Sequence, residues 1–234
     1  SNIALVTARS NKAGNSTHFF VSRNIVEYKC GERTTNSSVF PLFQYETGAF
    51  GEKPNFNYDY LKEVESKLGI CVSSNKGNET ATPWDLFAYI YAVLYTPSFR
   101  EEYKDFLNRD FPIVPYPRDK KQFWSMSKIG DKLIRIHLLE EEFIPKASFC
   151  GNDYNIQKIE YNSKRVYINK SSYFDGIEQA VWEYIVGGYQ PCHRWLKERK
   201  GLALTEDDIC HYVQFCESIS ETLALMDELD CEYK

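Results

Sequence analysis

Four basic side chains lie within seven residues near the C-terminal third of the chain, a spacing that suits the binding of a polyanion. The segment at 181–201 reads VWEYIVGGYQPCHRWLKERKG. Aromatic and β-branched residues stop at two glycines, and beyond Pro191 the sequence is basic and helix-prone. A helix beginning there would offer backbone N–H groups and charges to phosphates. The four side chains are Arg194, Lys197, Arg199 and Lys200.

The two glycines before this segment allow two interpretations. Gly187 and Gly188 can adopt backbone angles that are closed to other residues, which would let a ligand approach closely. Alternatively, they form a tight turn, Trp195 and Leu196 pack inward, and the basic side chains are only solvated. Both interpretations are consistent with these residues.

A second set of side chains suited to nucleic acid lies near the N-terminus, around the turn-like sequence SNKAGNST at 10–17. The donor and acceptor groups of Arg, Lys and Asn match guanine edges, adenine edges and phosphates. The alternative is an ordinary hydrophilic hairpin loop. The candidate residues for groove or phosphate contact are Arg9, Asn11, Lys12, Asn15 and His18.

Signatures of catalysis are missing from the sequence. It has no G-x-x-x-x-G-K-[ST], G-x-G-x-x-G, H-E-x-x-H or G-x-S-x-G pattern. It also lacks the Asn/Asp-Pro-Pro-aromatic tetrapeptide of amine methyltransferases. The acidic run at 140–142 is typical of a solvated surface, and Cys192 beside His193 is weak evidence for a nucleophile, because such pairs meet in space. We therefore predict no catalytic residue in this chain.

The cysteines indicate free thiols. Seven are present, an odd number, and none forms a C-x-x-C pair. This pattern favours a reducing cytoplasm over a disulfide framework or a zinc site. We predict no metal site and a cytoplasmic location, and no apolar run approaches the length of about 20 residues that a membrane span needs.

Charge is distributed unevenly, although the formal net charge is −5. Residues 1–36 contain five basic and two acidic side chains, and 108–137 contain seven and three. Residues 205–234 hold nine acids and one lysine. A bipolar molecule of this kind can bind a polyanion on one face despite its net sign, although chance fluctuation of surface charge is the simpler explanation.

Periodicity predicts the elements that would position these residues. Strands are expected at 2–9, 17–26 and 37–46, the last at an edge or bulge because it contains Pro41. Helices are expected at 58–69, from Thr82 with Asp85 as capping-box partner, from Pro97, and at 120–139. A hairpin is expected at 156–170, and a long helix from Thr205 with Asp208 as its partner.

The order of these elements is α+β: N-terminal antiparallel strands, central helices, a β-hairpin and a C-terminal helical part. At 43% apolar residues the chain is a folded protein. We expect a single domain over 1–234, within which 1–57 is rich in strands and 58–234 is mainly helical.

Four segments resemble, in this order, the C-terminal target recognition (specificity) domain of type ISP restriction-modification enzymes and related fused adenine-N6 DNA methyltransferases. They are SSVFPLFQYE, DLFAYIYAVLYTPSFREEYKDFLNRDFPIVPYP, VWEYIVGGYQPCHRWLKERKG and LTEDDICHYVQFCESISETLALMDEL. The opening NIALVTARS followed by HFFVSRNI is also similar. One departure is Ile113, which follows Pro112 where family members often carry arginine.

The resemblance implies a bacterial polypeptide with a nuclease, a translocase and an adenine-N6 methyltransferase, of which this chain matches only the specificity domain. It implies recognition of double-stranded DNA and positioning of that DNA for the upstream methyltransferase, with the methyltransferase and translocase domains as partners and no membrane. No cofactor is expected here, because S-adenosylmethionine and ATP with Mg²⁺ would bind only elsewhere in the parent enzyme. The alternatives are a docking or structural domain that does not bind DNA, and a hydrolase whose site is assembled from scattered residues.

Overall fold

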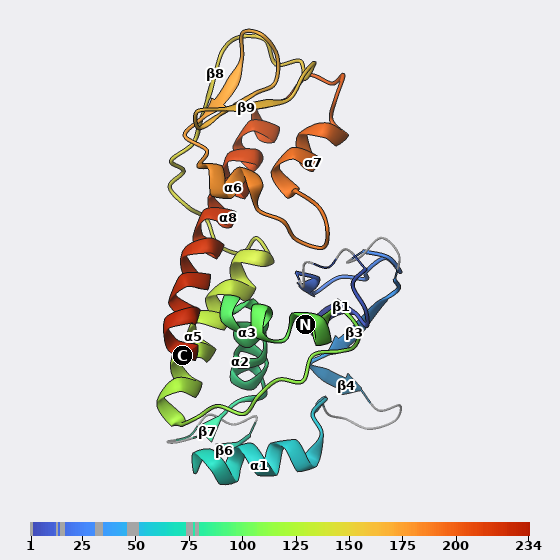
Figure 1. Ribbon diagram of the computed structural model, residues 1–234, viewed down its shortest axis with the longest axis vertical. Coiled ribbons are helices and arrows are strands. Elements are labelled where there is room, and N and C mark those ends of the chain that lie inside the picture. The colour runs from blue at the N-terminus through green and yellow to red at the C-terminus, as the bar shows by residue number, and fades with distance from the viewer. Residues whose placement is uncertain are drawn as a thin grey trace. The chain divides into compact units, whose positions relative to one another are not determined.

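The computed structural model describes residues 2–12, 14, 17–30, 35–45, 52–73, 77 and 80–234 (Figure 1). Their contacts divide the chain into two units. Unit 1 comprises Ser1–Leu138 and Leu225–Lys234, and unit 2 comprises Leu139–Ala224. The strand-rich part expected at 1–57 belongs to unit 1, together with the first helices that follow it.

Unit 1 begins with an antiparallel sheet of strand order β2-β1-β3. Its strands are β1 (Ala4–Ala8), β2 (Phe19–Ser22) and β3 (Ser37–Pro41). Since β3 is an edge strand, Pro41 occupies the kind of position expected for it. The strand expected at 37–46 is interrupted at the buried Leu42, and β4 (Phe43–Tyr45) pairs instead with β5 (Glu52–Pro54).

Helix α1 (Tyr58–Leu68) follows, capped by Asn57 and ended by Gly69 at φ 58°. Two short strands, β6 (Cys71–Val72) and β7 (Thr80–Ala81), then pair in parallel, which the sequence did not predict. The pairing leads the chain directly into the next helix.

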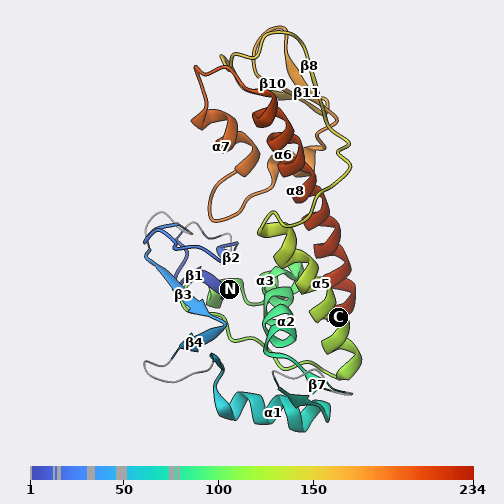
Figure 2. The ribbon, with the colours of Figure 1, turned by 180° about the vertical axis from the view of Figure 1, so that it is seen from behind.

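The centre of unit 1 is helical. In α2 (Pro83–Tyr95), Thr82 and Asp85 form the predicted capping box. This helix packs along α5 (Lys120–His137), as both views show (Figures 1 and 2). The helix expected from Pro97 is divided at Tyr103 into α3 (Pro97–Glu102) and α4 (Lys104–Leu107).

Unit 2 contains a four-stranded antiparallel sheet of order β8-β11-β10-β9. The predicted hairpin is its outer part, β9 (Glu160–Asn162) and β10 (Arg165–Tyr167), joined by two residues of positive φ. The other strands, β8 (Ser148–Cys150) and β11 (Tyr173–Asp175), were not predicted. Together these strands confirm the α+β class.

Three helices complete the chain: α6 (Gln179–Glu183), α7 (Pro191–Glu198) and α8 (Glu206–Tyr233). The capping box predicted for α8 is present, because Thr205 and Asp208 bind each other through side-chain and backbone groups. The core of unit 2 joins the sheet to α8 at Phe174 and Tyr212, whose ring centroids are 4.5 Å apart. The last residues of α8 belong to unit 1.

All seven cysteines are free thiols. Among the described residues, no helix combines the length and apolar character that crossing a membrane requires. The same residues hold no group of three or more side chains that could ligate a metal ion.

Candidate nucleic-acid interface

The two glycines of the basic segment form a tight turn. Gly187 and Gly188 have φ of 57° and 78°, and Val186 and Tyr189 exchange two backbone hydrogen bonds of 2.9 and 3.0 Å. A two-residue turn with positive φ at both positions favours glycine or asparagine. The structure therefore agrees with the second interpretation of these glycines, in which they shape the backbone before α7.

Helix α7 is fixed to unit 2 by its apolar face. Cys192 and Leu196 are fully buried, and the Tyr212 hydroxyl donates a hydrogen bond of 3.3 Å to the Cys192 carbonyl. Before the helix, the Gln190 amide donates to the Trp182 carbonyl. This packing leaves the basic residues of α7 and its C-terminal end on the outer side.

Two of the four basic side chains are held by partners within the chain. Arg194 forms an ion pair of 2.7 Å with Glu198 and lies 4.0 Å from the Tyr189 ring centroid. The hydrogen bond to Glu198 raises the pKa of Arg194 above its ordinary value. Arg199 lies 3.7 Å from the centroid of the Trp195 ring and donates to the Trp195 carbonyl at 3.2 Å.

The other two basic side chains, Lys197 and Lys200, are exposed. Within the described part of the chain neither has an ion-pair partner. Arg199 is only partly neutralised, since its contact with Asp208 is 3.5 Å long. The outer side of α7 therefore presents two free ammonium groups next to a guanidinium whose plane is oriented by an aromatic ring.

Unit 2 has a second polar surface, which sequence reasoning missed. An open hollow of about 780 Å³ lies beside the β9–β10 hairpin. Lys158 is paired with Glu160, whereas Lys170 has no ion-pair partner among the residues described. The signal was present, because 156–170 contains four basic residues and one acid. The hollow is lined by Gln157, Lys158, Glu160, Tyr161, Asn162, Tyr167, Asn169 and Lys170.

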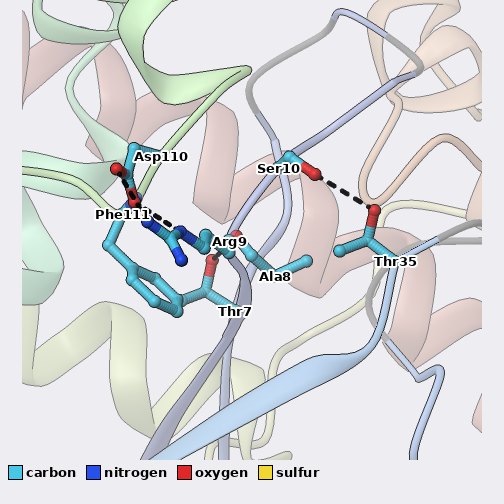
Figure 3. Close-up of polar contacts among 7 residues, drawn as sticks. All are labelled: Thr7, Ala8, Arg9, Ser10, Thr35, Asp110 and Phe111. Carbon is cyan, nitrogen blue, oxygen red and sulfur yellow. Dashed lines mark hydrogen bonds and ion pairs between the residues drawn. The ribbon is translucent and has the colours of Figure 1, made fainter.

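The N-terminal candidates surround the connection between β1 and β2 in unit 1. Figure 3 shows Arg9 against Asp110, with Nε–Oδ1 and Nη2–Oδ2 distances of 3.0 and 3.4 Å. This hydrogen bond is the main reason that the pKa of Asp110 is below its ordinary value. Ser10 contacts Thr35 through their hydroxyl groups at 3.2 Å (Figure 3). Arg9 is exposed but already paired, so a DNA contact would compete with Asp110.

Two of the candidates are buried. Asn11 is 2% exposed and His18 is fully buried, and the Asn11 amide lies 3.0 Å from His18 Nδ1. The Asn11 backbone N–H also donates to the Asn108 carbonyl at 3.1 Å. Because a buried side chain cannot reach a base edge, this pair holds the connection in place. Hydrophilic composition suggested exposure here, but the pairing of the two side chains depends on the fold.

The remaining N-terminal candidates are Lys12 and Asn15. Lys12 is exposed and has no ion-pair partner among the described residues. Asn15 lies outside the residues that the structure describes. The structure thus brings Arg9, Asn11, Lys12 and His18 together in unit 1, and the four basic residues of the α7 region together in unit 2.

Comparison with known proteins gives a single family and a consistent fold. A family model described as "Type ISP C-terminal specificity domain" matches residues 1–228. Among curated proteins, no sequence match is found.

Three solved structures are similar to this chain. They are an ATP-dependent type ISP restriction-modification enzyme, LlaBIII, bound to DNA (TM-score 0.71, 16% identity), a nuclease-deletion mutant of the type ISP enzyme LlaGI with a DNA substrate mimic (0.65, 18%), and a DrdV–DNA complex (0.75, 17%). They cover 98%, 97% and 97% of this chain, which spans only 16%, 21% and 24% of their lengths. At these identities the likeness establishes the fold, and it agrees with the resemblance seen in the sequence.

Proposed function

Because this chain belongs to the type ISP C-terminal specificity domain family, we propose that it recognises duplex DNA and positions it for an adenine-N6 methyltransferase in the same cytoplasmic polypeptide. The similar structures of LlaBIII, LlaGI and DrdV were each solved with DNA or a DNA mimic. Their agreement in fold over nearly the whole of this chain supports a common role.

The observation that carries the proposal is the outer side of α7 and its C-terminal end. Lys197 and Lys200 are exposed charges without ion-pair partners in the described part of the chain, and Arg199 stands beside them on Trp195. Such groups contact DNA phosphates and release the counterions condensed there, which makes binding favourable and salt-dependent. Phosphate contacts of this kind fix the register of a protein on the duplex.

Sequence reading requires contacts with base edges, and we assign it to the hollow beside the β9–β10 hairpin. Gln157 and Asn162 offer amide groups of the type that pair with adenine, and Lys170 suits the acceptors of guanine. The amide of Asn169 is already used, because it donates to the carbonyls of Asp153 and Asn155. We therefore expect Asn169 to shape the hollow and leave base contacts to the other side chains.

The chemistry of methylation and translocation belongs, in this proposal, to other parts of the polypeptide. The similar structures extend far beyond the share that this chain spans. S-adenosylmethionine and ATP with Mg²⁺ would bind in those parts. The role of this chain is to hold the target sequence while a target adenine leaves the stack.

The proposal predicts a loss of salt-dependent DNA binding when Lys197 and Lys200 are both changed to Gln. Fluorescence anisotropy with a labelled duplex at about 50 and 200 mM salt measures it. We expect affinity to fall by about tenfold or more at the lower salt, and the slope of log K against log salt to decrease by about two, one for each lost phosphate contact. Binding should weaken equally for every DNA sequence.

The matched control changes two exposed lysines of another helix, Lys121→Gln and Lys128→Gln in α5, and should leave the affinity unchanged. An unchanged slope in the Lys197/Lys200 variant would remove α7 from the interface. Absence of binding by the wild-type chain at about 50 mM salt would contradict the proposal itself.

A docking domain is the second candidate function, and one surface favours it. In unit 1 an apolar groove of about 250 Å³ is lined by Phe99, Tyr103, Phe106, Leu107, Ile113 and Pro115. Ile113 is 74% exposed and Phe106 39%. Exposed apolar side chains of this kind are typical of protein interfaces. The same titration separates the two functions, because a docking domain would not bind DNA unless the rest of the polypeptide were present.

A further inference from the structure

Arg100 is a buried arginine without an acidic partner. This residue of α3 is only 7% exposed, and its Nε donates a hydrogen bond of 2.5 Å to the Leu94 carbonyl. Its Nη2 atom is buried and has no hydrogen-bond acceptor. No carboxylate among the described residues forms an ion pair with it. The other buried charge of the described chain, Glu217, has Lys146 as a partner at 3.2 Å.

The surroundings of Arg100 compensate its charge incompletely. Its guanidinium lies 4.3 Å from the Tyr95 ring centroid and 5.9 Å from that of Phe19. Such cation–π contacts contribute about 2 kcal/mol when desolvated, whereas desolvation of an ion costs several. Arginine also has five N–H donors, of which the Leu94 carbonyl takes one. The free protein therefore keeps a positive group with unused donors.

The groups around Phe19 supply no negative charge. The pKa of His137 is lowered to about 3, first by burial and then by the charge of Arg100, so its imidazole is neutral at pH 7. The Phe19 carbonyl already accepts a hydrogen bond of 2.9 Å from Tyr95. Two residues earlier, the Thr17 hydroxyl oxygen is buried without a hydrogen-bond partner. Donors without acceptors thus lie on the chain on both sides of Phe19.

This cluster lies next to the β1–β2 connection. His18, which is paired with Asn11, stacks on Phe19 with ring centroids 4.8 Å apart, and Arg100 faces the same Phe19 ring. The connection carries the exposed Lys12. Buried side chains therefore link the exposed end of this connection to the guanidinium of Arg100.

We propose that Arg100 binds a phosphate group at the base of the β1–β2 connection. Its guanidinium presents a fixed fork that matches phosphate oxygens, and burial has already removed the side-chain freedom that an exposed lysine would lose on binding. The anion supplies the charge and the acceptors that Arg100 lacks. For the source of the phosphate, a DNA backbone, the inference rests on the proposed function. Lys12 would contact a neighbouring phosphate.

Thermal unfolding with simple anions tests the site without DNA. At pH 7 and constant ionic strength, chloride is replaced by inorganic phosphate or by acetate. Phosphate at roughly tenfold above its dissociation constant should raise Tm by about 3 °C. In Arg100→Gln this rise should disappear. The control Arg118→Gln removes an exposed arginine paired with Asp119 and should keep the rise.

Three outcomes would overturn the assignment: no effect of phosphate on the wild type, an undiminished effect in Arg100→Gln, or an equal effect of acetate, which would indicate a carboxylate partner instead. Removing an uncompensated charge should not prevent folding. If Arg100→Gln nevertheless fails to fold, Arg100→Lys keeps the charge without the fork and should bind phosphate more weakly.

Duplex DNA provides the second arm of the experiment. Arg100→Gln should decrease the salt slope of DNA binding by about one. If the chain does not bind DNA but phosphate raises Tm only when Arg100 is present, the proposed function fails and the phosphate site stands. If DNA binding and its salt slope are unchanged in a variant that has lost the phosphate effect, DNA is not the source.

Discussion

At the scale of single residues, Asp230 shows how a distant side chain completes an element. Helix α3 begins at Pro97, and Thr96 makes no side-chain cap there. Asp230 of α8 takes this place, because its Oδ1 accepts a hydrogen bond of 2.7 Å from the Ser98 backbone N–H. Hydrogen bonds from Lys234 and then Ser98 lower the pKa of Asp230 to about 2. The carboxylate therefore stabilises the fold in its ionised form.

Changing Asp230 to Asn should lower the free energy of unfolding at pH 7 by about 1–2 kcal/mol, as loss of a helix cap does. Since the folded pKa lies below the unfolded value of 3.8, the carboxylate contributes its full stability above that value and loses it as pH falls toward about 2. The difference between wild type and variant should therefore shrink between about pH 4 and pH 2.

Urea unfolding at neutral and acidic pH measures this difference, and the exposed Asp227→Asn on the same helix is the control. A difference that stays constant down to acidic pH would show that the carboxylate charge has no part in it.

Sequence predicted residue roles well where the partners are close in the chain. Both capping boxes, at Thr82 and Thr205, are confirmed because the cap and its partner are three residues apart. Asn11 and His18 were expected at a DNA surface and are instead buried together. Their burial depends on Asn108, almost a hundred residues away, and local composition contains no trace of it.

At the scale of elements, α2 and α5 pack closely at Gly130. A Cβ atom at this position would lie 2.0 Å from the Ala88 carbonyl oxygen and 3.1 Å from the Ala92 Cβ. The first of these neighbours is backbone and cannot move independently of the helix. The approach of the two helices therefore requires glycine at this position of α5.

Gly130→Ala should destabilise the protein, although alanine is the better helix former by about 1 kcal/mol. Overpacking costs about 1–3 kcal/mol or more, and this contact involves backbone, so we expect the upper end. Urea unfolding gives the sign directly. Lys128→Ala, at an exposed position of the same helix, should change stability little. A stabilised Gly130→Ala would mean that the helices separate at no cost.

The elements that sequence missed are short and paired over long separations. The β9–β10 hairpin was predicted because its strands are adjacent and its turn is local. Strands β8 and β11 have three residues each, and their partners include Phe149 and Phe174, twenty-five residues apart. A three-residue strand has too few positions for alternation to be visible, so tertiary pairing alone defines it.

At the scale of the whole molecule, the two units have separate cores. A matched pair of substitutions tests whether they open separately: Ile168→Val in unit 2 and Ile134→Val in unit 1, both at fully buried positions. Each should cost about 1 kcal/mol. The first should speed amide hydrogen exchange in β10 and β11 by about fivefold, and the second in α2 and α5.

Exchange that accelerates throughout the chain in both variants would show one cooperative domain over 1–234, as the sequence analysis expected. At this scale the sequence was most informative about identity, because segments such as VWEYIVGGYQPCHRWLKERKG carry the family resemblance. It could not indicate where the units divide, because unit 1 is assembled from two separate stretches of chain.

This discontinuity has a consequence for how the molecule is made. A ribosome completes residues 139–224 before it reaches 225–234, the stretch that unit 1 needs for the Asp230 cap and for the hydrogen bonds from Gln122 to the carbonyls of Glu232 and Tyr233. The part that begins first is thus finished last. During synthesis the earlier helices wait with an uncapped end, while the inserted unit already has all of its residues.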